Sequence, residues 1–131
     1  MTNSNRKTEH FDAGQIILKK GDEATKAYMI VSGKVRVFLE EDTKQVELAT
    51  LGEDDIFGET AIFTDQVYGA NIEAIEKAEL FVITRESFNE MLKGADPVMR
   101  ALIRMLIERL KNTNQALLKS ETREFMDIAF I

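Results

Sequence analysis

The sequence predicts a mainly β fold with C-terminal helices. The expected architecture is an antiparallel β-roll, of the double-stranded β-helix or jelly-roll type, followed by a short helix and a long helix. Between Phe11 and Ile83, short β-branched and aromatic runs alternate with glycine and aspartate turns. After Thr84 the apolar period becomes helical. A length of 131 residues with 44% hydrophobic residues suits one domain with its own core.

Six apolar runs are the predicted strands. Ser32-Gly33 and the acidic run at residues 40–42 are the expected hairpin connections, because such residues favour turns. The acidic run is interpreted as a solvated loop and not as a metal site. The six runs are Ile16–Leu18, Tyr28–Val31, Val35–Leu39, Val46–Leu48, Ala70–Ile75 and Leu80–Ile83.

Capping residues predict where the two helices begin and end. Thr84 can cap a short helix that stops at Gly94. Asp96 and Pro97 then supply the cap and the first-turn proline of a second helix. The chain is thus divided into four segments, which are a polar leader at residues 1–10, the roll at 11–95, the long helix at 96–124 and an apolar tail at 125–131.

The long helix carries a heptad pattern, which predicts a homodimer interface. Leu102 and Met105 lie off this pattern and are expected to face the roll. The alternative is an amphipathic helix that packs only on its own domain. The predicted interface residues are Met99, Ile103, Leu106, Leu110, Thr113 and Leu117.

We expect the apolar tail to be buried against another surface, because a group of apolar side chains at a chain end is not normally left in water. It can cap the roll, bury against a second subunit or dock on a different protein partner. A cut end of a longer chain is the remaining interpretation.

The composition excludes several classes of function. There is no cysteine, so disulfides, thiolate metal sites and iron–sulfur clusters are excluded. The single His10 cannot supply the imidazoles of a β-roll metalloenzyme, and we predict no catalytic residue and no metal. The net charge of −6 argues against a nucleic-acid surface. No apolar run approaches eighteen residues, so we expect no membrane span, no signal peptide and a cytoplasmic location.

The segment IFGETAIFTDQVYGA, residues 56–70, carries the clearest chemistry. Gly58 allows a turn at positive φ, and Glu59 places a carboxylate beside the backbone N–H groups of Thr60 and Ala61. Such N–H groups can hold an anion, while the carboxylate can accept hydrogen bonds from a sugar hydroxyl. Taken alone, a Gly-Glu turn is also common in surface loops.

Five motifs follow one another along the chain. They are F-x-x-G-x-x-I from Phe11, K-G-D from Lys20, Y-x-I-x-x-G-x-V-x-V from Tyr28, Leu51-Gly52 and F-G-E from Phe57. Their order resembles the cyclic-nucleotide-binding domain family, the β-roll modules of catabolite-activator-type regulators, cyclic-AMP-dependent kinase regulatory subunits and gated channels. The resemblance runs from Phe11 to about Leu118, and it implies that the long helix is a dimerisation helix.

The resemblance also implies a phosphate-binding cassette. Glu59 matches the carboxylate that holds the ribose hydroxyl of cyclic AMP or cyclic GMP. Tyr68 stands where the family has the arginine that pairs with the cyclic phosphate, which is a departure from the family pattern. The implied ligand-binding residues are Phe57, Gly58, Glu59, Thr60, Ala61, Tyr68, Gly69 and Ala70.

The missing arginine bears on function. No Lys or Arg stands between Lys44 and Lys77. Arg100 or Arg104 can supply the charge instead, and the Tyr68 hydroxyl can donate one hydrogen bond. We therefore expect a non-enzymatic, dimeric regulatory sensor with a degenerate cassette. The alternative is a roll that serves protein interaction or dimerisation, or that binds another small ligand. A transcription regulator is not expected, because no room remains for a helix-turn-helix domain.

Overall fold

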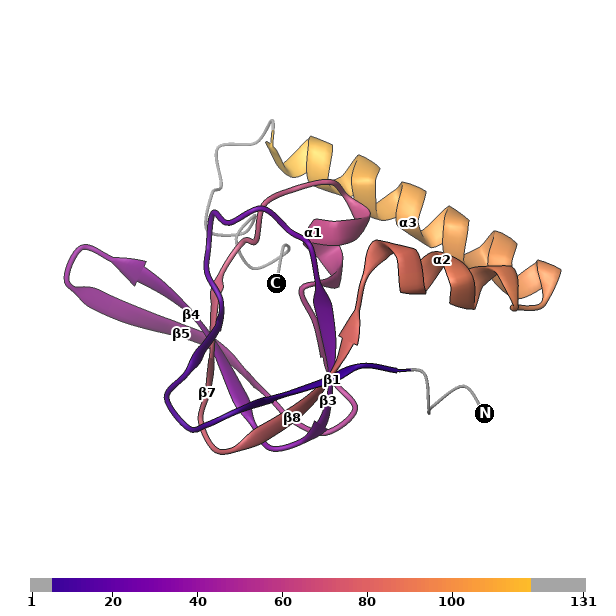
Figure 1. Cartoon of the computed structure of the whole chain (residues 1–131). Helices are drawn as coiled ribbons and strands as arrows, with labels where there is room; N and C mark the ends of the chain where they lie inside the picture. Colours follow the sequence, from indigo (N-terminus) through magenta and orange to yellow (C-terminus); the bar gives the residue numbers. More distant parts are fainter. Residues whose placement is uncertain (1–5, 119–131) are drawn as a thin grey trace.

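The computed structural model describes residues 6–118, which form two antiparallel sheets and three helices (Figure 1). The predicted fold class is confirmed. The strands are β1 (Thr8–Phe11), β2 (Ile16–Leu18), β3 (Ala27–Ser32), β4 (Val35–Glu41), β5 (Lys44–Leu51), β6 (Ile56–Phe57), β7 (Asn71–Ala74) and β8 (Ala78–Ile83). The helices are α1 (Glu59–Phe63), α2 (Arg85–Lys93) and α3 (Pro97–Leu118).

The strands form two four-stranded sheets that enclose the core. Their orders are β1-β8-β3-β6 and β2-β7-β4-β5. Side chains on the inner faces of both sheets are fully buried, among them Ile30, Val35, Val37 and Leu80. Alternate residues of a strand point to opposite faces, so a few β-branched and aromatic residues per strand suffice to build this core. In Figure 1 the β4–β5 hairpin projects to one side of the roll, and α2 and α3 lie on the other.

Four features differ from the predicted strands and turns. Glu40 and Glu41 of the predicted hairpin connection belong to β4, because they pair with Gln45 and Lys44 of β5. Strand β1 begins at Thr8, inside the segment predicted as a polar leader, because its residues pair with β8 and Phe11 faces Ala78 there. The short β6 pairs with β3. The Gly-Glu turn continues into α1, whose five residues are too few to show a helical period in the sequence.

The predicted helix caps are confirmed. The Ser87 N–H donates to Thr84 Oγ1 at 3.0 Å, and the Thr84 N–H donates to Ser87 Oγ at 2.9 Å, which makes a reciprocal capping box for α2. Gly94 follows the last residue of α2. At the start of α3, the Val98 N–H donates to Asp96 Oδ1 at 2.8 Å. Residues 119–124 of the predicted long helix and the predicted tail at 125–131 lie outside the described residues.

Helix α3 contacts α1, and its two apolar faces differ from the prediction. Ile103, Ile107 and Leu110 are half-buried. Leu102 and Met105, which were expected to face the roll, are 42% and 44% exposed, so that expectation is wrong. The half-buried residues 103, 107 and 110 have helical spacing and form one face of α3. Residues 102 and 105 lie to one side of that face. The side chains of the predicted interface residues Thr113 and Leu117 lie outside the described part.

Among the helices in the described range 6–118, none has both the length and the apolar character needed to cross a membrane.

Candidate functional site

Gly58 joins β6 to α1 with a backbone that other residues rarely adopt. Its φ is +82°, in the left-handed region that favours glycine. A Cβ at this position would lie 3.2 Å from both Leu18 Cδ1 and the Lys26 carbonyl oxygen. The backbone at Gly58 therefore packs closely against β2 and against the β2–β3 loop, which spans residues 19–26. The glycine predicted at this turn has a steric reason as well as a conformational one.

Glu59 begins α1 and has an unsatisfied carboxylate oxygen. Its Oε2 is buried and has no hydrogen-bond partner among the described residues. Burial raises the pKa of the Glu59 carboxyl above its ordinary value, while a hydrogen bond from its own backbone N–H acts in the opposite direction. Because buried polar groups are nearly always satisfied, an unpartnered oxygen of this kind needs an explanation.

The small side chains of the predicted cassette are buried. Thr60, Ala61 and Ala70 are all buried. Ala61 and Ala70 belong to the same core cluster as Phe57 and Tyr68. The structure therefore brings the two ends of the predicted cassette into one continuous apolar core.

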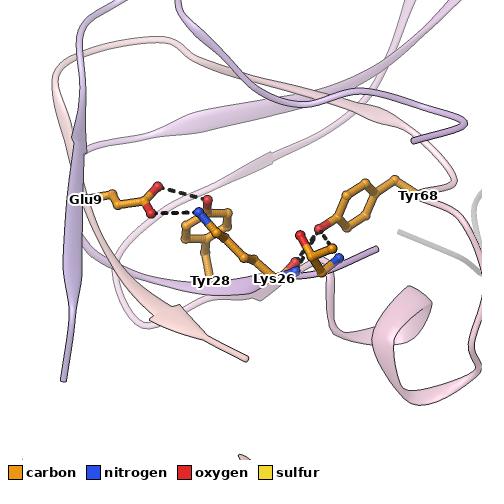
Figure 2. A network of polar contacts seen from close by, with 5 residues as sticks. Glu9, Lys26, Tyr28 and Tyr68 are labelled. Carbon is orange, nitrogen blue, oxygen red and sulfur yellow. Dashed lines mark hydrogen bonds and ion pairs between the residues drawn. The ribbon is translucent and has the colours of Figure 1, made fainter. Parts of the chain in front are cut away.

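Tyr68 is 6% exposed and its hydroxyl is fully used within the protein (Figure 2). The hydroxyl donates to the Lys26 carbonyl oxygen at 2.6 Å. It accepts from the Lys26 N–H at 3.0 Å and from the Thr25 N–H at 3.2 Å. A phenol has one proton to donate, so the hydrogen bond expected for a ligand phosphate is already made to backbone.

The backbone of Tyr68 fastens the same loop. The Tyr68 N–H donates to the Asp22 carbonyl oxygen at 3.0 Å, and the Gly21 N–H donates to the Tyr68 carbonyl oxygen at 2.9 Å. The Lys20 N–H donates to Asn71 Oδ1 at 2.9 Å. The far end of the cassette and the β2–β3 loop are thus joined by both main chain and side chains.

A groove of about 320 Å³ lies beside the Tyr68 ring. Its lining contains two basic and two acidic residues, which are Lys19, Lys26, Asp22 and Glu23. The groove also reaches β2 and the ring of Tyr28, which belongs to the core. Its electrostatic character is therefore balanced and not that of an anion site.

An acid–base network lies next to the groove (Figure 2). Lys26 Nζ lies 3.0 Å from Glu9 Oε2, and the Tyr28 hydroxyl donates to Glu9 Oε1 at 3.0 Å. Burial acts to raise the pKa of Glu9, but the hydrogen bonds from Lys26 and Tyr28 outweigh it and hold that pKa below its ordinary value. Burial and the neighbouring Glu9 raise the pKa of Tyr28. The Lys26 charge is thereby committed to Glu9.

The two arginines that can replace the missing charge both lie on α3. The Arg100 guanidinium donates to the Lys93 carbonyl oxygen at 3.3 Å, at the end of α2. Arg104 lies on an exposed position of α3. Sequence reasoning missed Thr25 and Lys26, because they act through backbone groups that carry no residue signature.

The chain matches a family model described as "Cyclic nucleotide-binding domain" over residues 8–94. A cGMP-dependent protein kinase of Drosophila melanogaster, isozyme 2 forms cD5/T2, is 33% identical over 93 residues. That alignment covers 68% of this chain and 10% of the kinase. The human cGMP-dependent protein kinase 2 is 37% identical over 97 residues, which cover 72% of this chain and 13% of that kinase. The chain therefore spans about a tenth of the length of these relatives.

Solved structures resemble the fold closely. The half-site-occupied form of the EAL enzyme Bd1971 has a TM-score of 0.81 and 34% identity, and the match covers 83% of this chain and 98% of that chain. The catabolite activator protein of Thermus thermophilus has a TM-score of 0.68 and 28% identity, with 87% of this chain and 54% of that chain covered. These likenesses agree with the resemblance inferred from the motifs.

Proposed function

The chain belongs to the cyclic nucleotide-binding domain family, and on that premise we propose that it is a non-enzymatic regulatory sensor module with a half-retained cassette. The retained half is the hydroxyl-binding end at Glu59. The altered half is the phosphate-binding end, where Tyr68 replaces the family arginine. The observation that carries the proposal is the buried Glu59 Oε2, which has no partner in the described part of the chain. A ligand hydroxyl would satisfy it.

Kinship supports cyclic nucleotides as the first ligands to test. Related structures of the EAL enzyme Bd1971 are described as a cAMP-bound form and a cGMP-bound form, at 33% and 34% identity. The kinase relatives are named for their dependence on cGMP. Binding of either nucleotide by this chain is part of the proposal.

The altered half should weaken that binding. A charge-assisted hydrogen bond contributes about 1.5–3 kcal/mol, and its loss corresponds to roughly ten- to a hundredfold in affinity. We therefore expect cyclic nucleotides to bind this chain less tightly than they bind relatives that keep the arginine. The Arg100 guanidinium donates to the Lys93 carbonyl oxygen and Arg104 is exposed, so we expect neither arginine to compensate.

The test restores the charge. Tyr68→Arg should strengthen binding of cyclic AMP or cyclic GMP by about tenfold or more, measured by titration calorimetry. Glu59→Ala in the same background should cancel much of the gain, because it removes the acceptor for the ribose hydroxyls. Val67→Arg is the matched control. The substitution adds the same charge one residue away, at a side chain that is 51% exposed.

Two results would contradict the proposal. A folded Tyr68→Arg variant that binds no cyclic nucleotide would mean that the cassette is no longer a ligand site. The chain would then be the alternative, a roll that serves protein interaction or dimerisation, which the fully bonded Tyr68 favours. Binding of cyclic nucleotide by the unmodified chain that is as tight as binding by Tyr68→Arg would mean that the missing arginine does not weaken the site.

Exposed apolar side chains on α3 support the proposal of a homodimer. Single exposed apolar residues are ordinary, but a contiguous stripe on one helix marks an interaction surface. The stripe consists of Val98, Met99, Leu102, Met105 and Leu106, each at least 42% exposed. It retains Met99 and Leu106 of the predicted interface and adds residues that the heptad pattern had left out.

The dimer can be broken by a charge in the stripe. Leu106→Glu would place an unpaired ion in the interface, and light scattering should then show a monomer where the parent chain is a dimer. Asn112→Glu is the control, because it adds the same charge at an exposed polar position of α3. A monomeric parent chain at high micromolar concentration would contradict the proposal.

A further inference from the structure

The two ends of the cassette favour different chemical groups in a ligand. The Tyr68 end has neither a free hydrogen-bond donor on its hydroxyl nor a positive charge for an anion. The Tyr68 hydroxyl donates once and accepts twice, all to backbone groups of Thr25 and Lys26. A phenol oxygen with these three partners has no proton left for a phosphate oxygen. The ring itself is buried in the core, so it is not free to swing aside.

The cations beside Tyr68 are already balanced. Lys26 is paired with Glu9 at 3.0 Å. Lys19 lines the groove together with Asp22 and Glu23. A cyclic phosphate that entered here would lose its hydration and gain no net positive charge in return. Because burying an unpaired charge is far more costly than burying a neutral polar group, this end disfavours a phosphate ester.

The Glu59 end requires donors. Its Oε2 is a buried acceptor with no partner in the part of the chain that the structure describes. A carboxylate has two oxygens, and each can accept more than one hydrogen bond. Two adjacent hydroxyl groups on a five-membered sugar are donors of the right kind for it. An acceptor that lacks such a donor is left with its desolvation cost.

We propose that the preferred ligand of this cassette is an uncharged ribonucleoside and not a cyclic nucleotide. This inference rests on the proposed function, in which Glu59 binds a ligand hydroxyl. Glu59 accepts hydrogen bonds from the vicinal ribose hydroxyls. The Tyr68 end rejects the charged ester, because Tyr68 has already donated its one proton to the Lys26 carbonyl oxygen and brings no positive charge. Tyr68 is thus the specificity-determining residue, and Glu59 is the residue that binds.

The experiment titrates the full chain by calorimetry with adenosine, guanosine, cyclic AMP and cyclic GMP at the same pH and ionic strength. At least one nucleoside should bind ten- to a hundredfold more tightly than its own 3′,5′-cyclic phosphate, on the magnitude of one missing charge-assisted hydrogen bond. The 2′-deoxynucleoside should bind at least tenfold more weakly than that nucleoside, because it lacks one of the two hydroxyls.

Two variants give the inference its controls. Glu59→Gln should weaken the nucleoside by about tenfold or more, whereas Glu53→Gln, which removes the same charge at an exposed position, should not change it. Tyr68→Arg should invert the preference, so that the cyclic nucleotide binds more tightly than the nucleoside. Melting curves of each variant show that the roll is folded.

The outcomes separate this inference from the proposed function. Tighter binding of cyclic nucleotide than of nucleoside by the unmodified chain overturns the inference and leaves the sensor function standing. Absence of all binding in the unmodified chain, with cyclic-nucleotide binding by Tyr68→Arg, also overturns the inference and keeps the cassette. Absence of binding in both proteins, with both folded, overturns the two together.

Discussion

The two ends of the cassette, Glu59 and Tyr68, differ in how completely the protein satisfies them. Glu59 has a buried carboxylate oxygen without a partner in the described residues. The Tyr68 hydroxyl makes three hydrogen bonds to backbone, two of them at 3.0 Å or shorter. The buried Glu59 oxygen therefore carries a desolvation cost that a hydrogen bond from a bound molecule could relieve. The Tyr68 hydroxyl has its hydrogen bonds without any ligand.

The contrast separates a group that is open to a ligand from a group that serves the structure. Polar groups that bind ligands often lack a hydrogen-bond partner in the free protein, and this lowers the free energy of unfolding. The neutral side chain at position 68 holds the β2–β3 loop through the backbone groups of Thr25 and Lys26. The loop is then fixed whether or not a ligand is present. Mutations at the two ends should therefore change the free energy of unfolding in opposite directions.

The largest expected effect follows from removing the Tyr68 ring. Tyr68→Ala should lower the free energy of unfolding by about 3–5 kcal/mol, as for other large buried rings. Tyr68→Phe keeps the ring and should cost about 1–3 kcal/mol, because the backbone groups of Thr25 and Lys26 lose a partner. Urea unfolding of the two variants separates packing from hydrogen bonding. An unchanged midpoint in Tyr68→Phe would mean that the hydroxyl does not hold the loop.

A smaller effect is expected at the turn before Glu59. Gly58→Ala should lower the free energy of unfolding by about 1–2 kcal/mol, the usual cost of a side chain at positive φ. The contacts of the new Cβ with Leu18 and Lys26 add to it. Thermal unfolding measures the loss, and Gly52→Ala is the control, because a Cβ there meets nothing within 4 Å. Equal losses in the two variants would remove the steric argument for Gly58.

Much of the fold was predictable, because its signals are local. Thr84, Gly94 and the Asp96-Pro97 pair marked helix ends by capping chemistry. Short β-branched and aromatic runs between glycine and aspartate turns located the six predicted strands. Strand β1 was not predicted, because the polar residues before Phe11 become a strand only by pairing with β8. The orientation of α3 was misjudged at Leu102 and Met105, since a heptad pattern does not say which face meets the roll.

The candidate site was predictable only in part. The Gly-Glu turn could be found from the residues themselves, and the departure at Tyr68 from the family resemblance, together with the absence of Lys and Arg between residues 44 and 77. The partners of Tyr68 could not be found, because Thr25 and Lys26 contribute main-chain atoms and any residue has these. The pairing of Lys26 with Glu9 depends on β1, which was itself missed.

The smallest stability effect gives the most direct test of the contrast. Burial raises the pKa of Glu59 in the folded protein. The stability that the protonated carboxyl contributes is therefore complete below the ordinary carboxyl pKa and is lost as pH rises through the raised pKa. Glu59→Gln, which cannot ionise, should escape that loss. Its gain should be smaller in size than the loss caused by Gly58→Ala.

The measurement is urea unfolding of the ligand-free parent chain, Glu59→Gln and Tyr68→Phe between pH 4 and pH 8. We predict that Glu59→Gln is more stable than the parent at pH 8, and that the difference closes as pH falls toward 4. Tyr68→Phe should be less stable than the parent across the whole range. A Glu59→Gln variant that is no more stable than the parent at pH 8 would show that Glu59 is already satisfied, and would contradict the account of a cassette with one open end.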